Sequence, residues 1–159
     1  PGHGNPSSPI LFVGEGPGEH EDIFGIPFIG IAGTALTMWL EKMPLKREQV
    51  YIANVLKCRP KGNRTPQPEE CRTCIETNLN REIKMIGPRV MVAVGAVALK
   101  ALIPDAQGIT VSHGKWFSYR DIPLTPIFHP AYVLRQEGAR FAEANQQVYR
   151  DLMQAYSRL

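Results

Sequence analysis

The sequence has few cysteines, no long apolar run and no strong excess of either charge. Its three cysteines, an odd number, do not suggest a disulfide framework, and we expect a cytoplasmic protein. No apolar stretch approaches the ~20 residues that a membrane-spanning helix needs, so we expect no membrane contact. A net charge of +3 does not by itself indicate a nucleic-acid partner, because such a partner is recognised by where the charges lie.

Motifs for nucleotides and catalytic metals are also missing. The glycine-rich segment GEGPG at 14–18 lacks the third glycine of a dinucleotide fingerprint, and Pro17 removes a backbone N–H that a pyrophosphate would use. The segment GIPFIGIAG at 25–33 has no Gly-Lys-Ser/Thr, so it is not a P-loop. The acidic run at 19–22 lacks the spacing that converges side chains on one ion. We therefore expect no nucleotide and no divalent metal in catalysis.

What is present fits one α/β domain. The length of 159 residues and the 43% hydrophobic content suit a single domain over 1–159. Because residue 1 is Pro rather than Met, we expect trimming at the N-terminus. Residues 1–9 read as an irregular lead-in. Apolar runs predict central strands at 10–13, 50–54, 90–95 and 124–128, with an edge strand at 116–120. Periodic segments predict helices at 33–43, from 66–70 to Gly87, at 96–102 and at about 140–159.

This alternation predicts a three-layer α/β/α sandwich with a central, mostly parallel four-stranded sheet. Polar motifs follow three of the strands: GEGPG after the first, Asn54 at the end of the second and His129 after the last. Ligands of open parallel sheets bind beyond the carboxyl ends of the strands. The sequence therefore predicts one site at that edge.

Four motifs occur in order along the chain: GEGPGEHED, GIPFIGIAG, YIANVLKCRPKGNRTPQPEE and FHPAYVLR. With them the chain closely resembles the bacterial and archaeal family-four uracil-DNA glycosylases, over about 2–159. The resemblance implies a monofunctional hydrolase that cuts the N-glycosidic bond of uracil in DNA and leaves an abasic site for base-excision repair. It also implies a monomer acting on single- or double-stranded uracil-containing DNA, in the nucleoid of a bacterial or archaeal cytoplasm.

The resemblance assigns residues to the pocket for a flipped-out base. Phe28 matches the stacking ring, although plain core packing would also explain a Phe. Asn54 matches the amide that reads uracil, since a carboxamide offers one donor and one acceptor, although it could instead cap a turn. Glu21 would form the wall that excludes thymine, where relatives use a Tyr and this chain has Gly18, or it is a solvated acid.

The resemblance also implies the catalytic groups. His129 matches the residue that stabilises negative charge on uracil O2, and the backbone N–H of Gly16 would assist it. Glu15 is our first candidate to activate water. Many superfamily members carry an Asp where this chain has Gly16, so Glu15, Glu21 and Asn63 all stay open for that role.

DNA contacts are expected from a basic segment and from the HPAYVLR motif. The basic segment, a phosphate clamp or simply a solvated loop, carries Lys57, Arg59, Lys61 and Arg64. Leu134 is a candidate wedge for the vacated base stack, with core packing as its alternative, and Arg135 a phosphate contact. His113 is a further candidate for DNA contact.

The family typically carries a structural four-iron, four-sulfur cluster on four cysteines. Cys58 and Cys74 match two of these ligands and Cys71 is extra. The other two ligands have no match, so either the chain is trimmed or the protein lacks the cluster, and free thiols remain an alternative.

Two other functions stay open at this stage. One is a superfamily relative with a different base preference. The other is a non-catalytic single-stranded-DNA-binding module, which would need a stacking platform and a positive groove but not Glu15 and His129 around one small pocket.

Overall fold

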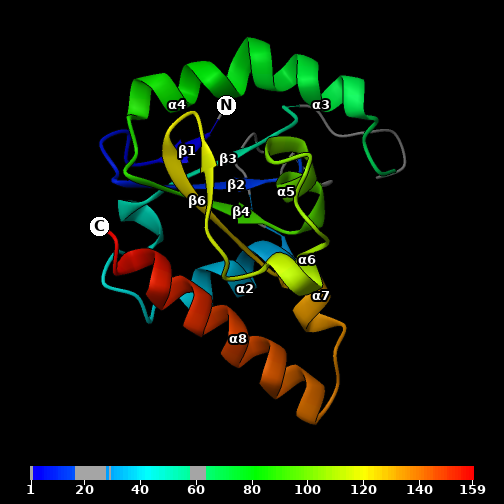
Figure 1. Cartoon of the computed structure of the whole chain (residues 1–159). Helices are drawn as coiled ribbons and strands as arrows, with labels where there is room; N and C mark the ends of the chain where they lie inside the picture. The colour runs from blue at the N-terminus through cyan, green and yellow to red at the C-terminus, as the bar shows by residue number, and fades with distance from the viewer. Residues whose placement is uncertain (1, 17–27, 29, 58–63) are drawn as a thin grey trace.

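A computed structural model describes residues 2–16, 28, 30–57 and 64–159. Its sheet has six strands in the order β1-β3-β2-β4-β6-β5 (Figure 1). In chain order these are β1 His3–Gly4, β2 Ile10–Gly14, β3 Tyr51–Asn54, β4 Val90–Val94, β5 Phe117–Tyr119 and β6 Ile122–Ile127. The predicted parallel core is confirmed, because β3, β2, β4 and β6 pair in parallel.

The sheet as a whole is mixed, which corrects the four-stranded prediction. The lead-in is not wholly irregular, because β1 pairs antiparallel with β3. The predicted edge strand is β5, which pairs antiparallel with β6. Both are short strands at sheet edges, where few apolar residues are required and the sequence signal is weak, and only β1 was not predicted.

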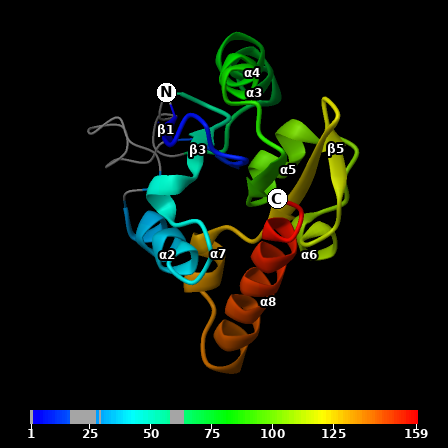
Figure 2. The ribbon, with the colours of Figure 1, turned by 90° about the vertical axis from the view of Figure 1, so that its left-hand side faces the viewer.

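Helices cover both faces of the sheet, as Figures 1 and 2 show. One layer holds α2 (Ile31–Leu40), α7 (Pro130–Leu134) and α8 (Ala139–Tyr156). The other holds α5 (Ala96–Leu102) and a long helical segment formed by α3 (Pro68–Cys74), the π-helical η3 (Ile75–Leu79) and α4 (Asn80–Ile86). The short η1 (Arg47–Gln49) and α6 (Ile109–Ser112) lie in connections.

Strand periodicity explains the two cores. In β2, Ile10 and Phe12 pack with α2 and α8, while Leu11 and Val13 pack with the α3–α4 segment and α5. Successive strand side chains point to opposite faces, so a strand buried on both sides must be apolar throughout. This is why β2 and β4 read as continuous apolar runs. None of the helices in the described ranges is long and apolar enough to cross a membrane.

Candidate active site

The carboxyl ends of the four parallel strands meet at one edge of the sheet. In β2 and β3, Gly14 lies opposite Asn54, and in β4 and β6, Val94 lies opposite Ile127. The residues that follow these ends are therefore neighbours in space. Glu15 follows β2 directly, and His129 stands two residues beyond β6.

Gly14 lies against both the Phe28 ring and the Asn54 amide, and its lack of a side chain leaves room for them. A Cβ on this residue would overlap the Phe28 ring and come within 2.7 Å of the Asn54 Oδ1 atom. Phe28 is 6% exposed and has a φ of 56°, a left-handed conformation that a bulky residue seldom adopts. Gly33 helps to hold it, since a Cβ there would overlap the Phe28 carbonyl. Backbone strain of this kind is often found at functional sites.

Asn54 is a buried polar side chain with an unmet hydrogen-bonding atom. It is 8% exposed, and its Oδ1 has no hydrogen-bond partner among the described residues. Leaving a buried acceptor unpaired costs about 1–3 kcal/mol, so native proteins rarely retain one without a reason. A ligand with an N–H placed against the Phe28 ring would satisfy it.

His129 is a neutral hydrogen-bond donor. Its Nδ1 accepts the backbone N–H of Ala131 at 3.0 Å and so caps α7, which leaves the ring hydrogen on Nε2. Burial, with the positive charge of Arg135 as a smaller contribution, lowers the pKa of His129 to about 4. The His129 and Phe28 ring centroids are 6.0 Å apart. Behind the imidazole lies Gly95, with a φ of 92°, where a Cβ would stand 2.9 Å from the His129 Cβ.

Glu15 is the carboxylate nearest in sequence to this edge. Its backbone carbonyl accepts the N–H of Leu56 at 2.9 Å, just as the Gly14 carbonyl accepts the N–H of Val55 at 2.8 Å. The loops after β2 and β3 are thus held together beyond the sheet. Burial raises the pKa of Glu15, which makes the carboxylate a better proton acceptor. Gly16 packs against Leu56, where a Cβ would lie 3.1 Å from the Leu56 Cβ.

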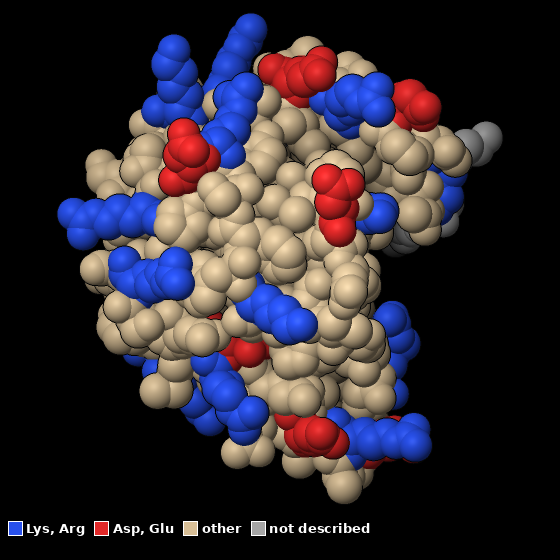
Figure 3. Space-filling model, viewed as in Figure 1, with Lys and Arg blue, Asp and Glu red and all other residues tan. Residues whose placement is uncertain are grey.

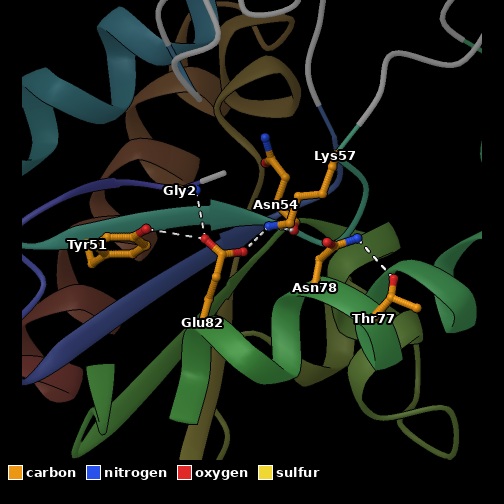
Figure 4. A network of polar contacts seen from close by, with 7 residues as sticks. All are labelled: Gly2, Tyr51, Asn54, Lys57, Thr77, Asn78 and Glu82. Atoms are coloured by element: carbon orange, nitrogen blue, oxygen red, sulfur yellow. Dashed lines mark hydrogen bonds and ion pairs between the residues drawn. The ribbon is translucent and has the colours of Figure 1, made fainter. Parts of the chain in front are cut away.

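Lys57 is tied to the protein rather than free for DNA. Its Nζ donates to the Asn54 carbonyl at 3.0 Å and forms an ion pair with Glu82, as Figure 4 shows. Glu82 also accepts the backbone N–H of Gly2 at 2.7 Å and the hydroxyl of Tyr51 at 3.3 Å. Burial, with Glu82 beside it, raises the pKa of Tyr51 to about 12. Lys57 therefore holds the end of β3, which sequence reasoning missed because Glu82 lies 25 residues away.

Other candidate DNA contacts are exposed. Leu134 is 43% exposed, so core packing does not explain it, and Arg135 is exposed beside it. The Arg64 guanidinium donates to both carboxylate oxygens of Glu70, at 2.7 and 2.9 Å. That contact lowers the pKa of Glu70 to about 2.

Several predicted residues are not placed by the structure. Glu21, Cys58, Arg59 and Asn63 lie outside the described residues. Cys74 is a half-buried free thiol and Cys71 a buried one. Within the described part of the chain no group of three potential metal ligands comes together.

The sequence of this chain is similar to those of several known proteins. The sequence model of the uracil DNA glycosylase superfamily matches residues 1–153. The type-4 uracil-DNA glycosylase of Thermotoga maritima is 44% identical over 98% of this chain and 80% of its own length. That of Archaeoglobus fulgidus is 43% identical over 84% of this chain and 71% of its own. A type-5 uracil-DNA glycosylase of Thermus thermophilus is 35% identical over 65% of this chain and 53% of its own.

Proposed function

The chain belongs to the uracil-DNA glycosylase superfamily, and we propose that it hydrolyses the N-glycosidic bond of uracil in DNA, leaving an abasic site for base-excision repair. The observation that carries this proposal is the buried Oδ1 of Asn54, which lies near the Phe28 ring and has no hydrogen-bond partner in the part of the chain that the structure describes. A single-stranded-DNA-binding module would have no use for such an atom or for a neutral His129. The type-4 and type-5 relatives are both named uracil-DNA glycosylases, which favours uracil as the base.

In the bound state the flipped base would stack on Phe28. Uracil offers an N3–H donor and an O4 acceptor. Asn54 offers the complement, with Oδ1 receiving N3–H and Nδ2 donating to O4. Glu21 is our candidate for the wall that excludes thymine's methyl group.

Cleavage breaks the bond between C1′ and N1, and the electron pair leaves with the uracil. The resulting anion carries negative charge on O2, to which His129 would donate its Nε2–H. The backbone N–H of Gly16 would add a second donor. A water oxygen bonds to C1′ of the cationic sugar, and its proton passes to Glu15. Asn63 would orient that water.

The DNA strand would be held outside this pocket. Arg59, Arg64 and Arg135 would contact phosphates, and Leu134 would enter the gap that the base leaves. The relatives come from bacteria and archaea. We propose that this protein is likewise bacterial or archaeal and acts as a monomer on nucleoid DNA in the cytoplasm. Its substrate would be single- or double-stranded DNA that contains uracil.

We propose Cys58 and Cys74 as two of the four cysteine ligands of a four-iron, four-sulfur cluster. Cys74 fits, since its thiol is free and only half buried, and Cys58 is its proposed partner. When bound, the cluster supplies structural support. No electron transfer is required, because glycosidic hydrolysis changes no oxidation state.

The proposed function predicts uracil release without any added nucleotide or divalent metal. A uracil-containing oligonucleotide is incubated with the protein in chelator, and alkali then breaks the strand at abasic sites. We expect cleavage at the uracil position alone, with the thymine-containing oligonucleotide intact as control. A strict requirement for Mg²⁺, or an intact uracil strand, would contradict the proposal.

Lys57 and Arg64 should contribute differently to the salt dependence of DNA affinity, because Lys57 is largely buried in its pair with Glu82 whereas Arg64 is exposed. Arg64→Ala should flatten the dependence of DNA affinity on salt by about one slope unit, if a phosphate replaces Glu70 as the partner of Arg64. Lys57→Met should leave that slope unchanged. It should lower the free energy of unfolding by about 1–3 kcal/mol, because Glu82 loses its cation. If Lys57→Met flattened the slope, Lys57 would contact a DNA phosphate after all, and the structural role assigned to it would be wrong.

A further inference from the structure

A buried carboxylate stands on the apolar face of α8, far from the proposed chemistry in sequence. Asp151 is 5% exposed, and its Oδ2 lies 2.7 Å from the Nδ1 of His113. Burial raises the pKa of Asp151 and His113 counteracts that rise. Carboxylates are seldom buried unless a partner compensates their lost hydration. Here the partner is an imidazole from the turn after α6.

The turn is shaped to receive this carboxylate. Gly114, next to His113, has a φ of 75°, and a Cβ there would overlap the Asp151 carboxylate. The N–H of Gly114 donates to the Pro126 carbonyl of β6 at 2.9 Å. The pair is therefore fixed at once to α8 and to the strand that leads to His129.

From His113 a stack of rings runs to both sides of His129. The imidazole of His113 lies 4.4 Å from the Phe128 ring, and Phe128 lies 4.8 Å from the Tyr132 ring, centroid to centroid. Phe128 is 3% exposed and directly precedes His129. Tyr132 lies in the first turn after it and donates its N–H to the His129 carbonyl at 3.0 Å. The stacked rings thus belong to the residue before His129 and to the residue whose N–H is bonded to the His129 carbonyl, so the stack restrains the backbone of His129.

We propose that Asp151 and His113 are positioning residues for His129. Without touching the base or the DNA, they hold the Phe128–Tyr132 stack and through it the direction of the His129 imidazole. This inference rests on the proposed function, in which His129 must aim one N–H at a developing charge. A misplacement of about 1 Å at such a donor can cost roughly 100-fold in rate.

The test is a double-mutant cycle on single-turnover uracil release. His113→Ala should lower the rate roughly 10- to 100-fold with DNA affinity unchanged. In a His129→Ala background the same change should have an effect of about twofold or less, because the donor to be aimed is gone. His113→Arg should keep most of the rate, since a planar guanidinium can pair with Asp151 and lie on Phe128.

Two further variants separate positioning from general stability. Asn145→Ala removes another tie of α8, the 2.7 Å hydrogen bond that Trp39 donates to Asn145 Oδ1, and should lower the melting temperature without changing the rate. Asp151→Asn, which keeps the shape of the side chain, takes the place of His113→Ala in the cycle should the latter not fold.

The outcomes are distinct. A His113→Ala effect that persists in full in the His129→Ala background would overturn the inference, as would a loss confined to DNA affinity, which would make His113 a DNA contact. A wild-type rate in both His113→Ala and Asp151→Asn would also overturn it. If the wild-type protein released no uracil, the proposed function itself would be wrong.

Discussion

His129→Ala should slow uracil release roughly 100- to 1,000-fold and leave DNA affinity nearly intact. In the ground state O2 is a weak acceptor, whereas in the transition state it carries much of a negative charge. The Nε2–H of His129 therefore stabilises the transition state more than bound uracil. Single-turnover rates with the protein in excess over DNA, beside binding to an uncleavable duplex, measure the two effects separately.

The same pair of proteins also tests the protonation state of His129. Because the pKa of His129 is about 4, the imidazole is neutral near pH 7, and the rate ratio of wild type to His129→Ala should stay constant between about pH 5.5 and 8.5. An imidazolium with an ordinary pKa of about 6.5 would instead lose its advantage as the pH rose through that value. A falling ratio, or a mutant with the wild-type rate, would contradict the role assigned here.

The shifted pKa also has a consequence for stability. The folded pKa of about 4 lies below the unfolded value of about 6.5, so between these values the unfolded chain binds the extra proton. The contribution of neutral His129 to folding is therefore complete above about pH 6.5. It is lost as the pH falls through about 4. His129→Ala should show a weaker decline of melting temperature over this window than the wild type.

Much of the fold is readable from local pattern. The runs ILFV and VMVAV are buried on both faces, which only a covered parallel strand requires, and the helix at 96–102 has the predicted bounds. The short β1 escaped prediction because two residues carry no periodic signal. Its strand pairing comes from tertiary context.

The candidate site, like the fold, could be predicted from the sequence only in part. Asn54 and His129 stand at or just beyond strand ends, the edge where open parallel sheets bind their ligands, so the sequence could mark them as candidates. The partners of Lys57 and His113 could not be predicted, since they lie 25 and 38 residues away and depend on how whole layers pack. One signal was present for the second pair: Asp151 interrupts the apolar stripe of α8 that includes Val148 and Leu152. An acid in such a stripe must have a partner.

Asn54→Asp should abolish most uracil release at neutral pH, by roughly 100-fold or more. The amide supplies both a donor for O4 and an acceptor for N3–H, whereas an ionised carboxylate supplies acceptors alone. O4 would then face a second acceptor in a buried site, at a cost of about 1–3 kcal/mol for each unpaired group. Asn54 Oδ1 has no hydrogen-bond partner among the described residues, which leaves this atom for N3–H of the base.

The same substitution should create slight activity on cytosine. Cytosine presents an N4–H donor where uracil presents O4, and a carboxylate can accept it. Its N3 is an acceptor at neutral pH and gains a proton as the pH falls, so cytosine cleavage should rise towards lower pH. Matched oligonucleotides bearing uracil or cytosine, cleaved across pH by wild type, Asn54→Asp and Asn54→Ala, measure this. The Ala variant should lose uracil activity without gaining cytosine, because it offers neither donor nor acceptor. Full uracil activity in Asn54→Asp would mean that Asn54 does not read the base, and its Oδ1, which no described residue contacts by a hydrogen bond, would then need another ligand.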